Sequence, residues 1–579
     1  MDIKSLASEI LGMRFDNVTV TDGEKLTVTK SSGRITVSAP TTPEKMRGLT
    51  IVALNRDIPE YSVSEFPRFE KMGVMPDMSR GGVMRVDKLK EFIVRSALCG
   101  ANMLALYIED IYTLEDYPHL GYMRGAYTDG ELREIVSFAD SLGVEVVPAI
   151  QTLGHMAQYL SWEKETADLK DTRSVMMAGS EQTLRFIDSA ISKMAQIFPS
   201  KRVHIGMDEA HDVGLGNYLK QNGFQDRYAI LTDHLNKTVK ICEKYGMSPI
   251  MWSDMFFRLG SKTGKYYDTD STFPEHIKEQ VPNVDLMYWD YSHQSDAHYD
   301  KMFSRHRMLS DRISFAGAFC TFRGMLPNFG FTADCTAPAL KSCIRNGVKE
   351  VWATMWGDDG TQANYPDALY GFALFGEFCY CGENADPSRA QKIGTLISGI
   401  TEKVAASMSA AFLYNFTNPL FWGDVFYNIT GVDYSDGTAE NHFRSFENCG
   451  DGFTDTVLHI MKLKAQIYGK LKKAYDAGAD LQSFSSEILP DLIESLKNAK
   501  ALHIRRYLET NKVFGMEVLA ARYDAAIGRA EYALRKITDY ASGSSDAIEE
   551  LEYTELYGDQ KMKPYYNFSA FSRSVDVSL

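Results

Sequence analysis

Short apolar runs alternate with longer amphipathic stretches between about residue 70 and residue 356. The longer stretches, such as residues 87–100 and 181–198, carry apolar side chains at helical spacing. Alternation of this kind predicts a parallel sheet whose strands are covered by helices. The candidate strands are Gly73–Met78, Met103–Ile108, Val144–Ile150, Arg202–Met207, Ser248–Trp252, Val284–Trp289, Ile313–Phe319 and Val351–Trp356.

Eight strands in one such run are what a (β/α)8 barrel requires, so the sequence predicts an α/β protein built on a TIM barrel. A doubly wound open sheet is the competing architecture. It is disfavoured because no glycine-rich phosphate-binding loop follows the first predicted strand.

The segments on either side of the barrel have different patterns. Leu26, Val28, Ile35 and Val37 alternate with polar residues around a Ser-Ser-Gly turn, which predicts strands in a small α/β unit. Beyond residue 380 apolar residues recur at helical spacing, so a mainly helical region should pack on the barrel. The predicted units are residues 1–68, 69–380 and 381–579.

An irregular aromatic stretch, residues 416–437, interrupts the helical region and contains Trp422. Two interpretations are equally compatible with its composition. It is either a loop that returns to the barrel mouth, where Trp422 would contact a ligand, or a loop packed between the units.

Composition and charge narrow the class of protein. The chain has 579 residues, 44% hydrophobic and 24% charged, as expected of a folded protein with several units. Its net charge of -15 disfavours a nucleic-acid partner. Charges interrupt every apolar run near the N-terminus, so neither a leader nor a membrane anchor is predicted. The scattered cysteines suggest free thiols and a cytoplasmic location.

Carboxylates and indoles gather where the predicted strands end, and in a barrel these ends form the active site. Carboxylates accept hydrogen bonds from sugar hydroxyls and indoles stack on sugar rings, so the pattern favours a sugar site. In chain order the candidates are Asp77, Arg80, Glu109, Asp110, Gln151, His155, Asp208, Glu209, Trp252, Asp254, Tyr288, Trp289, Asp290, Trp356, Asp358 and Asp359.

The densest cluster is HIGMDEAHDVG, residues 204–214, and it has two interpretations. A metal-dependent hydrolase would use His155, His204 and His211 together with carboxylates. An acid pair would use Asp208 and Glu209, which share one site only if the chain leaves the strand pleat there. Neighbouring carboxyls are poorly placed on opposite sides of a sugar ring, which favours substrate-assisted glycoside cleavage.

HIGMDEA, PAIQTLGH and MWSDM together resemble glycoside hydrolase family 20, the β-N-acetylhexosaminidases, and within it the hexosaminidase D-like branch. The resemblance spans about residues 65–545 and includes MYWDY and MWGDDG. It implies a retaining exo-hydrolase that removes terminal β-linked GlcNAc or GalNAc through an oxazolinium intermediate, without a cofactor or metal. The implied partner is an oligosaccharide or small-molecule substrate; a homodimer is compatible with the sequence.

By this resemblance Glu209 is the general acid/base, and Asp208 orients the 2-acetamido group. Tyr288 would bond the acetamido oxygen. The implied walls of the sugar pocket are Trp252, Trp289 and Trp356. The other implied substrate-binding or supporting residues are Asp77, Arg80, Glu109, Asp110, His155, Asp254, Asp358 and Trp422.

Three places depart from the family pattern. Met72 stands where many members carry an arginine that binds ring hydroxyls. Cys320 and Phe322 lie in a stretch that usually contains a tryptophan, and Gln362 replaces an expected glutamate. Met72 predicts a weaker grip on the 3- and 4-hydroxyls, and the Cys320–Phe322 stretch predicts a looser or differently shaped pocket. Gln362 predicts a change beyond the terminal sugar. These departures also leave open a catalytically weak sugar-binding barrel, an alternative that the intact Asp208–Glu209 pair disfavours.

Overall fold

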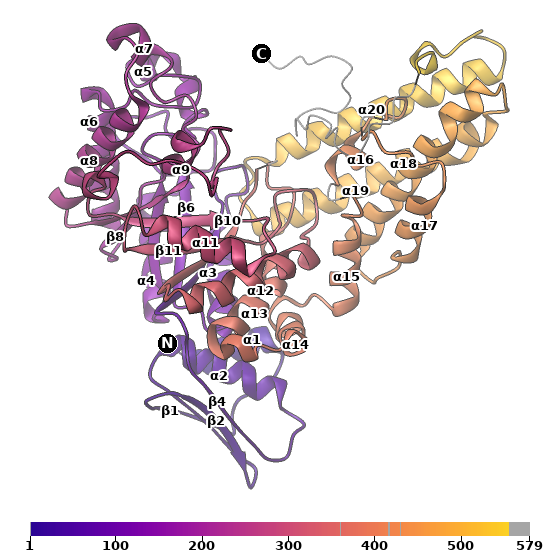
Figure 1. The fold of residues 1–579 in the computed structure, drawn as a ribbon. Helices are drawn as coiled ribbons and strands as arrows, with labels where there is room; N and C mark the ends of the chain where they lie inside the picture. The colour runs from indigo at the N-terminus through magenta and orange to yellow at the C-terminus, as the bar shows by residue number, and fades with distance from the viewer. Residues whose placement is uncertain (1, 359, 415–416, 429, 555–579) are drawn as a thin grey trace.

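The computed structural model describes residues 2–358, 360–414, 417–428 and 430–554 (Figure 1). Asp359, a candidate at the end of the eighth predicted strand, lies outside the described residues. A central barrel carries a small sheet at one end, and the helices after it extend to one side (Figure 1).

Eight parallel strands close into a barrel in the order β10-β11-β12-β5-β6-β7-β8-β9, which confirms the predicted TIM barrel. The strands are β5 (Lys71–Pro76), β6 (Met103–Glu109), β7 (Glu145–Ile150), β8 (Arg202–His204), β9 (Ser248–Trp252), β10 (Asp285–Asp290), β11 (Ile313–Ala318) and β12 (Glu350–Met355). Their bounds lie within two residues of the prediction except in β8, which ends three residues early.

Helices cover the outside of the barrel and follow most of its strands. They are α3 (Val86–Leu98), α4 (Asp129–Ser141), α6 (Glu181–Ile197), α8 (Arg227–Lys244), α11 (Asp296–His306), α12 (Phe329–Arg345) and α13 (Tyr365–Cys381). Shorter helices lie in the loops at α5 (Glu163–Thr166), α7 (Asn217–Asn222), α9 (Asp254–Gly260) and α10 (Ile277–Gln280).

Strand alternation divides the side chains between two cores. Met75, Tyr107, Trp252 and Met287 belong to a compact cluster inside the barrel. Their sequence neighbours, such as Val74, join the larger cluster between the strands and the covering helices. The direction of a strand-end side chain therefore decides whether it reaches the barrel mouth or the helical layer.

The N-terminal segment forms a four-stranded sheet in the order β1-β3-β2-β4. Its elements are α1 (Ile3–Leu11), β1 (Val18–Asp22), β2 (Leu26–Ser31), β3 (Arg34–Ala39), α2 (Thr42–Leu54) and β4 (Tyr61–Glu65). The side chains that the predicted alternation turns inward are all buried: Leu26, Val28, Ile35 and Val37. Buried Arg47 of α2 pairs with Glu65 and with Glu377 of α13, which ties this sheet to the barrel.

After the barrel the described chain is helical as predicted. The helices are α14 (Pro387–Ser398), α15 (Glu402–Ala410), α16 (Asn418–Trp422), α17 (Thr438–Ser445), α18 (Gly452–Asp476), α19 (Leu489–Thr510) and α20 (Met516–Ala541). The division at residues 68 and 380 remains a prediction; β4 and α13 end close to these positions. No helix in the described ranges is long and apolar enough to cross a membrane.

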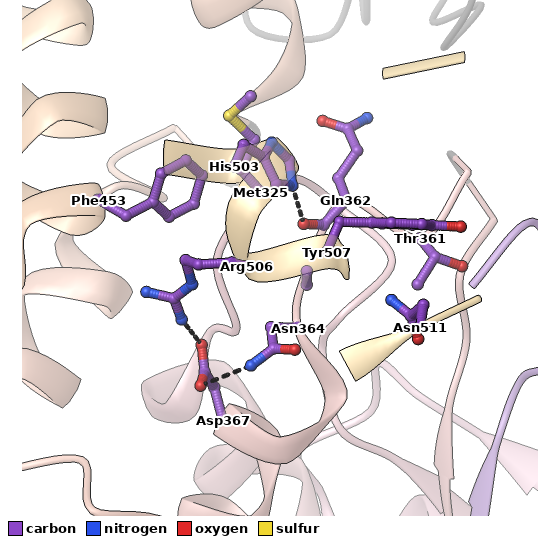
Figure 2. Close-up of a pocket in the computed structure, with 11 residues that line it drawn as sticks. Met325, Thr361, Gln362, Asn364, Asp367, Phe453, His503, Arg506, Tyr507 and Asn511 are labelled. Carbon is purple, nitrogen blue, oxygen red and sulfur yellow. Dashed lines mark hydrogen bonds and ion pairs between the residues drawn. The ribbon is translucent and has the colours of Figure 1, made fainter. Parts of the chain in front are cut away.

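A polar joint connects α19 to the loop between β12 and α13, and a small pocket lies within it (Figure 2). His503 Nε2 lies 2.8 Å from the carbonyl oxygen of Gln362, and the Arg506 guanidinium pairs with Asp367. These contacts fix α19 against the carboxyl end of β12. The helical region is therefore held beside the barrel mouth.

Candidate active site

The polar side chains predicted at the strand ends form one connected cluster at the barrel mouth. Arg80 is central to it, with Nη1 2.8 Å from Asp77 Oδ2. Its other guanidinium nitrogens lie 3.8 Å from carboxylate oxygens of Glu109 and Asp358. His155 joins the cluster, with Nδ1 3.3 Å from Arg80 Nη2. Loops after β5, β6, β7 and β12 thus meet at one place.

The chain leaves the strand pleat directly after β8. This departure is the condition under which Asp208 and Glu209 can face the same site. Gly206, Met207 and Glu209 have φ values of 67°, 70° and 48°. A positive φ in a non-glycine residue is strained and persists only where the surroundings enforce it. Here the Met207 N–H donates to the Gln151 side chain at 3.1 Å, and the Glu209 N–H donates to Asp254 Oδ2 at 3.0 Å.

Both carboxyls of the pair reach His155. Its Nε2 lies 3.1 Å from Asp208 Oδ2 and 3.5 Å from Glu209 Oε2. Burial lowers the pKa of His155, but the adjacent Asp208 outweighs burial and raises that pKa to about 9. His155 is therefore a cation beside the two carboxyls at neutral pH.

Asp208 is held in its ionised form. Burial opposes ionisation, but the His155 cation and a hydrogen bond from Gln151 Nε2 to Oδ1, 2.7 Å long, lower the pKa of Asp208 to about 2. A carboxylate with a cation and an amide donor fixed on it keeps a defined orientation. Asp208 can therefore orient and stabilise positive charge that develops nearby.

The pKa of Glu209 is shifted in the opposite direction to that of Asp208. Burial raises the pKa of its carboxyl, and the negative charges of Asp208 and Asp358 raise it further. Its side chain still retains 35% of its accessible surface, so a ligand at the mouth can reach it. The pKa values of two neighbouring carboxyls are thus shifted in opposite directions, which is the pattern of an acid and a charge-stabilising partner.

Asp77 and Asp254 lie behind this pair and are fully buried. Asp77 accepts hydrogen bonds from Ser79, Arg80 and the Gly357 N–H, and these partners lower its pKa against the effect of burial. Burial raises the pKa of Asp254 well above its ordinary value, and Asp208 adds to the shift. Both residues position others: Asp77 holds Arg80, and Asp254 holds the backbone of Glu209.

Glu109 and Asp110 form a buried supporting layer. The Tyr107 hydroxyl donates to Glu109 Oε2 at 2.9 Å, and Arg124 Nη1 lies 3.4 Å from Asp110 Oδ2. Burial raises the pKa of Glu109 to about 7 although Arg80 opposes it. These contacts link the loop after β6 to the base of the cluster.

Aromatic rings wall the barrel interior beneath the carboxyls. Trp252 and Trp356 lie 6.1 Å apart between ring centroids, and Trp289 stacks on Tyr291 at 5.0 Å. The buried Trp252 Nε1 has no hydrogen-bond partner among the described residues. Arg80 lies over the Trp356 ring, 5.2 Å from its centroid. Three of the predicted indoles thus border the site.

Two predicted substrate contacts are wrong. Tyr288 points out of the barrel: its ring packs against Phe303 and Phe315 in the helical layer, and its hydroxyl donates to Asp290 at 2.6 Å. The strand alternation that turns Trp289 inward turns Tyr288 outward. A bond from Tyr288 to a ligand inside the barrel is therefore excluded by its direction.

Trp422 is the second misplaced residue. Only 3% of it is exposed, its ring packs on Tyr523 of α20, and its Nε1 donates to Gln362 Oε1 at 3.1 Å. It belongs to the core of the helical region and not to the barrel interior. Of the two sequence interpretations, the structure shows a loop packed between the units.

The departures from the family pattern also fall in unexpected places. Met72 faces the outer layer, so the residue at this position cannot bind ring hydroxyls, and Arg80 provides the guanidinium at the mouth instead. Gln362 and Cys320 are buried. Only Phe322 borders the barrel interior, with its ring 6.1 Å from that of Tyr291. The weaker grip on ring hydroxyls expected from Met72 is therefore not supported, whereas the looser or differently shaped pocket expected from Cys320 and Phe322 stays a prediction.

The three histidines of the metal interpretation have separate surroundings. His204 is buried against Trp252, and burial lowers its pKa to about 3; His211 is exposed and contacts Tyr266. None of these histidines belongs to a convergent group of three ligands in the described ranges. Such groups there are Asp290–His293–His298, whose imidazoles stack face to face at 3.5 Å, and Glu65–Glu377–Cys381, which is paired with arginines.

The sequence pattern places Gln151 among the strand-end candidates without a specific role, and it does not single out Tyr107 or Tyr291. Gln151 bridges the site, since its Nε2 donates to both Asp208 and the Tyr107 hydroxyl. Its position directly after β7 was the available signal. Tyr107 and Tyr291 lie at inward positions of β6 and just after β10, which only the register of the strands reveals.

A parallel barrel with two adjacent carboxyls at its mouth, one with a lowered and one with a raised pKa, has the architecture of a glycoside hydrolase. The sequence model of the glycosyl hydrolase family 20 catalytic domain matches residues 70–299, and that of the Glycoside Hydrolase 20C C-terminal domain matches residues 420–568. The chain belongs to glycoside hydrolase family 20.

Two curated relatives match part of this chain. Hexosaminidase D of Bos taurus is 25% identical over 239 residues, covering 38% of this chain and 62% of that protein. Hexosaminidase D of Homo sapiens is 24% identical over 237 residues, covering 38% of this chain and 44% of that protein. The match therefore spans less than two-thirds of the length of either relative.

Solved structures support the fold. The family 20 β-N-acetylhexosaminidase of Streptomyces coelicolor A3(2) superposes with a TM-score of 0.51 and 18% identity, covering 69% of this chain and 90% of that one. An exo-β-N-acetylglucosaminidase of Vibrio harveyi gives 0.52 and 15%, covering 70% and 73%. At these identities the likeness concerns the fold alone.

Proposed function

We propose that the protein is a retaining exo-β-N-acetylhexosaminidase that releases terminal β-linked GlcNAc, GalNAc or both by substrate-assisted catalysis. The observation that carries this proposal is the pair of adjacent carboxyls with opposed pKa shifts, Asp208 lowered and Glu209 raised. The hexosaminidase relatives and the family membership support the substrate class.

In the first step the protonated Glu209 gives its proton to the glycosidic oxygen, and the bond from that oxygen to the anomeric carbon breaks. The carbonyl oxygen of the 2-acetamido group forms a new bond to the anomeric carbon from the opposite face. The resulting oxazolinium ion carries a positive charge. The ionised Asp208 beside it stabilises that charge and holds the acetamido N–H.

In the second step the Glu209 carboxylate takes a proton from water, whose oxygen attacks the anomeric carbon. The bond to the acetamido oxygen breaks, and the neutral sugar leaves with its β configuration retained. Glu209 ends protonated, ready for the next cycle. No metal or cofactor is needed to balance either step.

The remaining cluster suits the sugar ring. Arg80 and Asp358 would hold ring hydroxyls, since their charged groups lie at the mouth beside Glu209. Trp252, Trp289 and Trp356 would enclose the ring and the acetamido methyl group. Tyr291, whose ring borders the same interior, replaces Tyr288 as the residue proposed to contact the acetamido group.

Paired substrates test the proposed function. We expect an aryl β-N-acetylglucosaminide or β-N-acetylgalactosaminide to be cleaved at least about 10³-fold faster, in kcat/KM, than the matching 2-hydroxy glycoside, because the latter lacks the nucleophile. Equal cleavage of both sugars would rule out substrate assistance. Binding without turnover would favour the sugar-binding alternative. Comparing the two acetamido sugars would also establish which is preferred.

The pH profile should respond to His155. The reaction needs Asp208 ionised, so activity is lost as pH falls through the depressed pKa of Asp208, and needs Glu209 protonated, so activity is lost as pH rises through the raised pKa of Glu209. His155 lowers both pKa values. In His155→Gln we therefore expect both limbs of kcat/KM to move to higher pH by about 1 unit.

Profiles of kcat/KM against pH for the wild type and the variant measure this displacement. His211→Gln is the matched control, because His211 is an exposed histidine on the neighbouring loop, after β8, where it contacts Tyr266. An unchanged acid limb in His155→Gln would show that His155 does not set the charge of Asp208.

A further inference from the structure

Large apolar side chains remain exposed on three segments near the barrel mouth: the loop after β6, the loop after β7, and the turn from α19 into α20. Met123 is 68% exposed, Val513 is 53% exposed and Phe514 is 39% exposed. Contiguous exposed apolar surface of this kind marks an interaction site more often than isolated exposed residues do. The exposed side chains on the three segments are Tyr122, Met123, Trp162, Val513, Phe514 and Val518.

The turn between α19 and α20 is fastened to the loop after β5, which carries Arg80. The Arg85 N–H donates to the Thr510 carbonyl at 3.0 Å, and the Lys512 N–H donates to the Val83 carbonyl at 2.7 Å. The Tyr507 hydroxyl donates to the Gly81 carbonyl, one residue from Arg80. The helical region therefore contributes a fixed wall to the mouth of the barrel.

Two close approaches show how near this turn lies to the site. A Cβ atom on Gly515 would be 2.4 Å from the Gly81 carbonyl oxygen, and one on Gly125 would be 3.0 Å from the Phe514 ring. Gly125 follows Arg124, whose guanidinium bonds the Ser79 carbonyl and lies beside Asp110. Phe514 thus packs on the loop that supports the catalytic cluster.

The loops after β6 and β7 together provide a second aromatic surface. The Trp162 ring lies 4.5 Å from His119 and 5.6 Å from Tyr122 between centroids, and His119 is tied to Glu165 at 2.6 Å. Charged groups border the apolar surface: Lys512 Nζ pairs with Glu131 at 2.8 Å. Rings next to polar side chains match a sugar, which has apolar C–H faces and hydroxyl edges.

We propose that the α19–α20 turn, through Phe514 with Val513 and Val518, forms a leaving-group subsite that binds the sugar to which the terminal hexosamine is attached. This inference rests on the proposed function and deepens it. The turn is hydrogen-bonded to the loop that carries Arg80, so it lies beside the sugar that Arg80 and Asp358 are proposed to hold. The helical region then helps to select the linkage or the identity of the second sugar.

Phe514→Ala tests the subsite with two substrates that share the terminal sugar. One is a β-linked N-acetylhexosamine disaccharide, which fills the subsite; the other is the β-N-acetylhexosaminyl fluoride, whose leaving group is a single atom. We expect kcat/KM for the disaccharide to fall about 10-fold, the loss typical of one stacking contact. For the fluoride the fall should be under about 2-fold.

A binding measurement separates failure of the subsite from failure of the proposed function. In a Glu209→Gln background, calorimetry should show that Phe514→Ala weakens binding of the disaccharide about 10-fold. Binding of the monosaccharide should be unaffected. This holds whether or not the wild type turns over. Phe66→Ala, a change at another exposed phenylalanine in the N-terminal segment, is the control and should change neither ligand.

Phe514 would only support the fold if Phe514→Ala lowered kcat/KM equally for the disaccharide and the fluoride. Equal weakening of disaccharide and monosaccharide binding would show the same. No loss for the disaccharide would mean that the surface has another occupant, such as a second copy of the chain. Either result overturns the subsite. If the wild type cleaved no acetamido sugar at all, the proposed function itself would be refuted.

Discussion

Glu209→Gln should lower kcat/KM for a β-linked disaccharide by about 10³-fold, within the range by which general acid catalysis accelerates such steps. The amide has the size of the carboxyl and can donate a hydrogen bond, but it cannot give up a proton to the departing oxygen. The leaving group of an activated aryl glycoside is a stable phenolate, so it needs little protonation as it departs. For this substrate kcat/KM, which reports the first step, should fall much less.

The dependence of kcat/KM on the leaving group is the decisive readout, because loss of folding would lower kcat/KM equally for both substrates. Steady-state rates over a series of aryl glycosides with leaving groups of different acidity provide it. Asp212→Asn is a suitable control, since Asp212 is an exposed carboxylate three residues further along the same loop. A uniform loss over the whole series would contradict the acid role of Glu209.

The barrel was predictable because its evidence is local and repeated. Each strand is a short apolar run, and the polar residues that follow it must lie at one end of a parallel barrel. The positions of Asp77, Glu109, His155 and Asp208 at the barrel mouth are therefore predictable from the sequence alone. Strand β8 is the one strand that ends well before its predicted end. It is short because the chain leaves the pleat before Asp208 and Glu209, which allows both carboxyls to share one site.

The direction of side chains was less predictable. Tyr288 and Trp289 are equally aromatic and adjacent, and only the register of β10 decides that Trp289 faces the interior. Met72 was matched to a ring-binding position, yet it lies on the outer face of β5. One residue of displacement reverses the face of a strand, so motif spacing alone does not fix contacts.

Contacts between distant segments could not be read from the sequence. Trp422 meets Gln362, and Tyr507 meets Gly81, through the packing of the helical region on the barrel. The sequence correctly indicated that Asp208 would raise the pKa of Glu209. It did not show that burial is the larger cause, nor that His155 and Gln151 keep Asp208 ionised.

Asp208→Asn should lower kcat for acetamido substrates by about 10²–10³-fold, comparable to the loss of one preorganised electrostatic partner of a transition state. The neutral amide cannot stabilise the positive charge of the oxazolinium ion. It also loses the attraction to the His155 cation, so the acetamido group is no longer held for attack. The loss should therefore appear in the first step and persist for activated aryl glycosides, unlike that of Glu209→Gln.

A 2-acetamido series with increasing fluorination of the methyl group measures whether the substrate still supplies the nucleophile. In the wild type the rate should fall steeply as fluorine weakens the carbonyl oxygen, whereas in Asp208→Asn the dependence should be shallower. Near-identical circular dichroism and thermal unfolding of variant and wild type would exclude a folding defect, a necessary check because Asp208 is buried. An unchanged fluorine dependence together with a loss restricted to poor leaving groups would place Asp208 on the acid side of the reaction, beside Glu209, and would contradict its role toward the acetamido group.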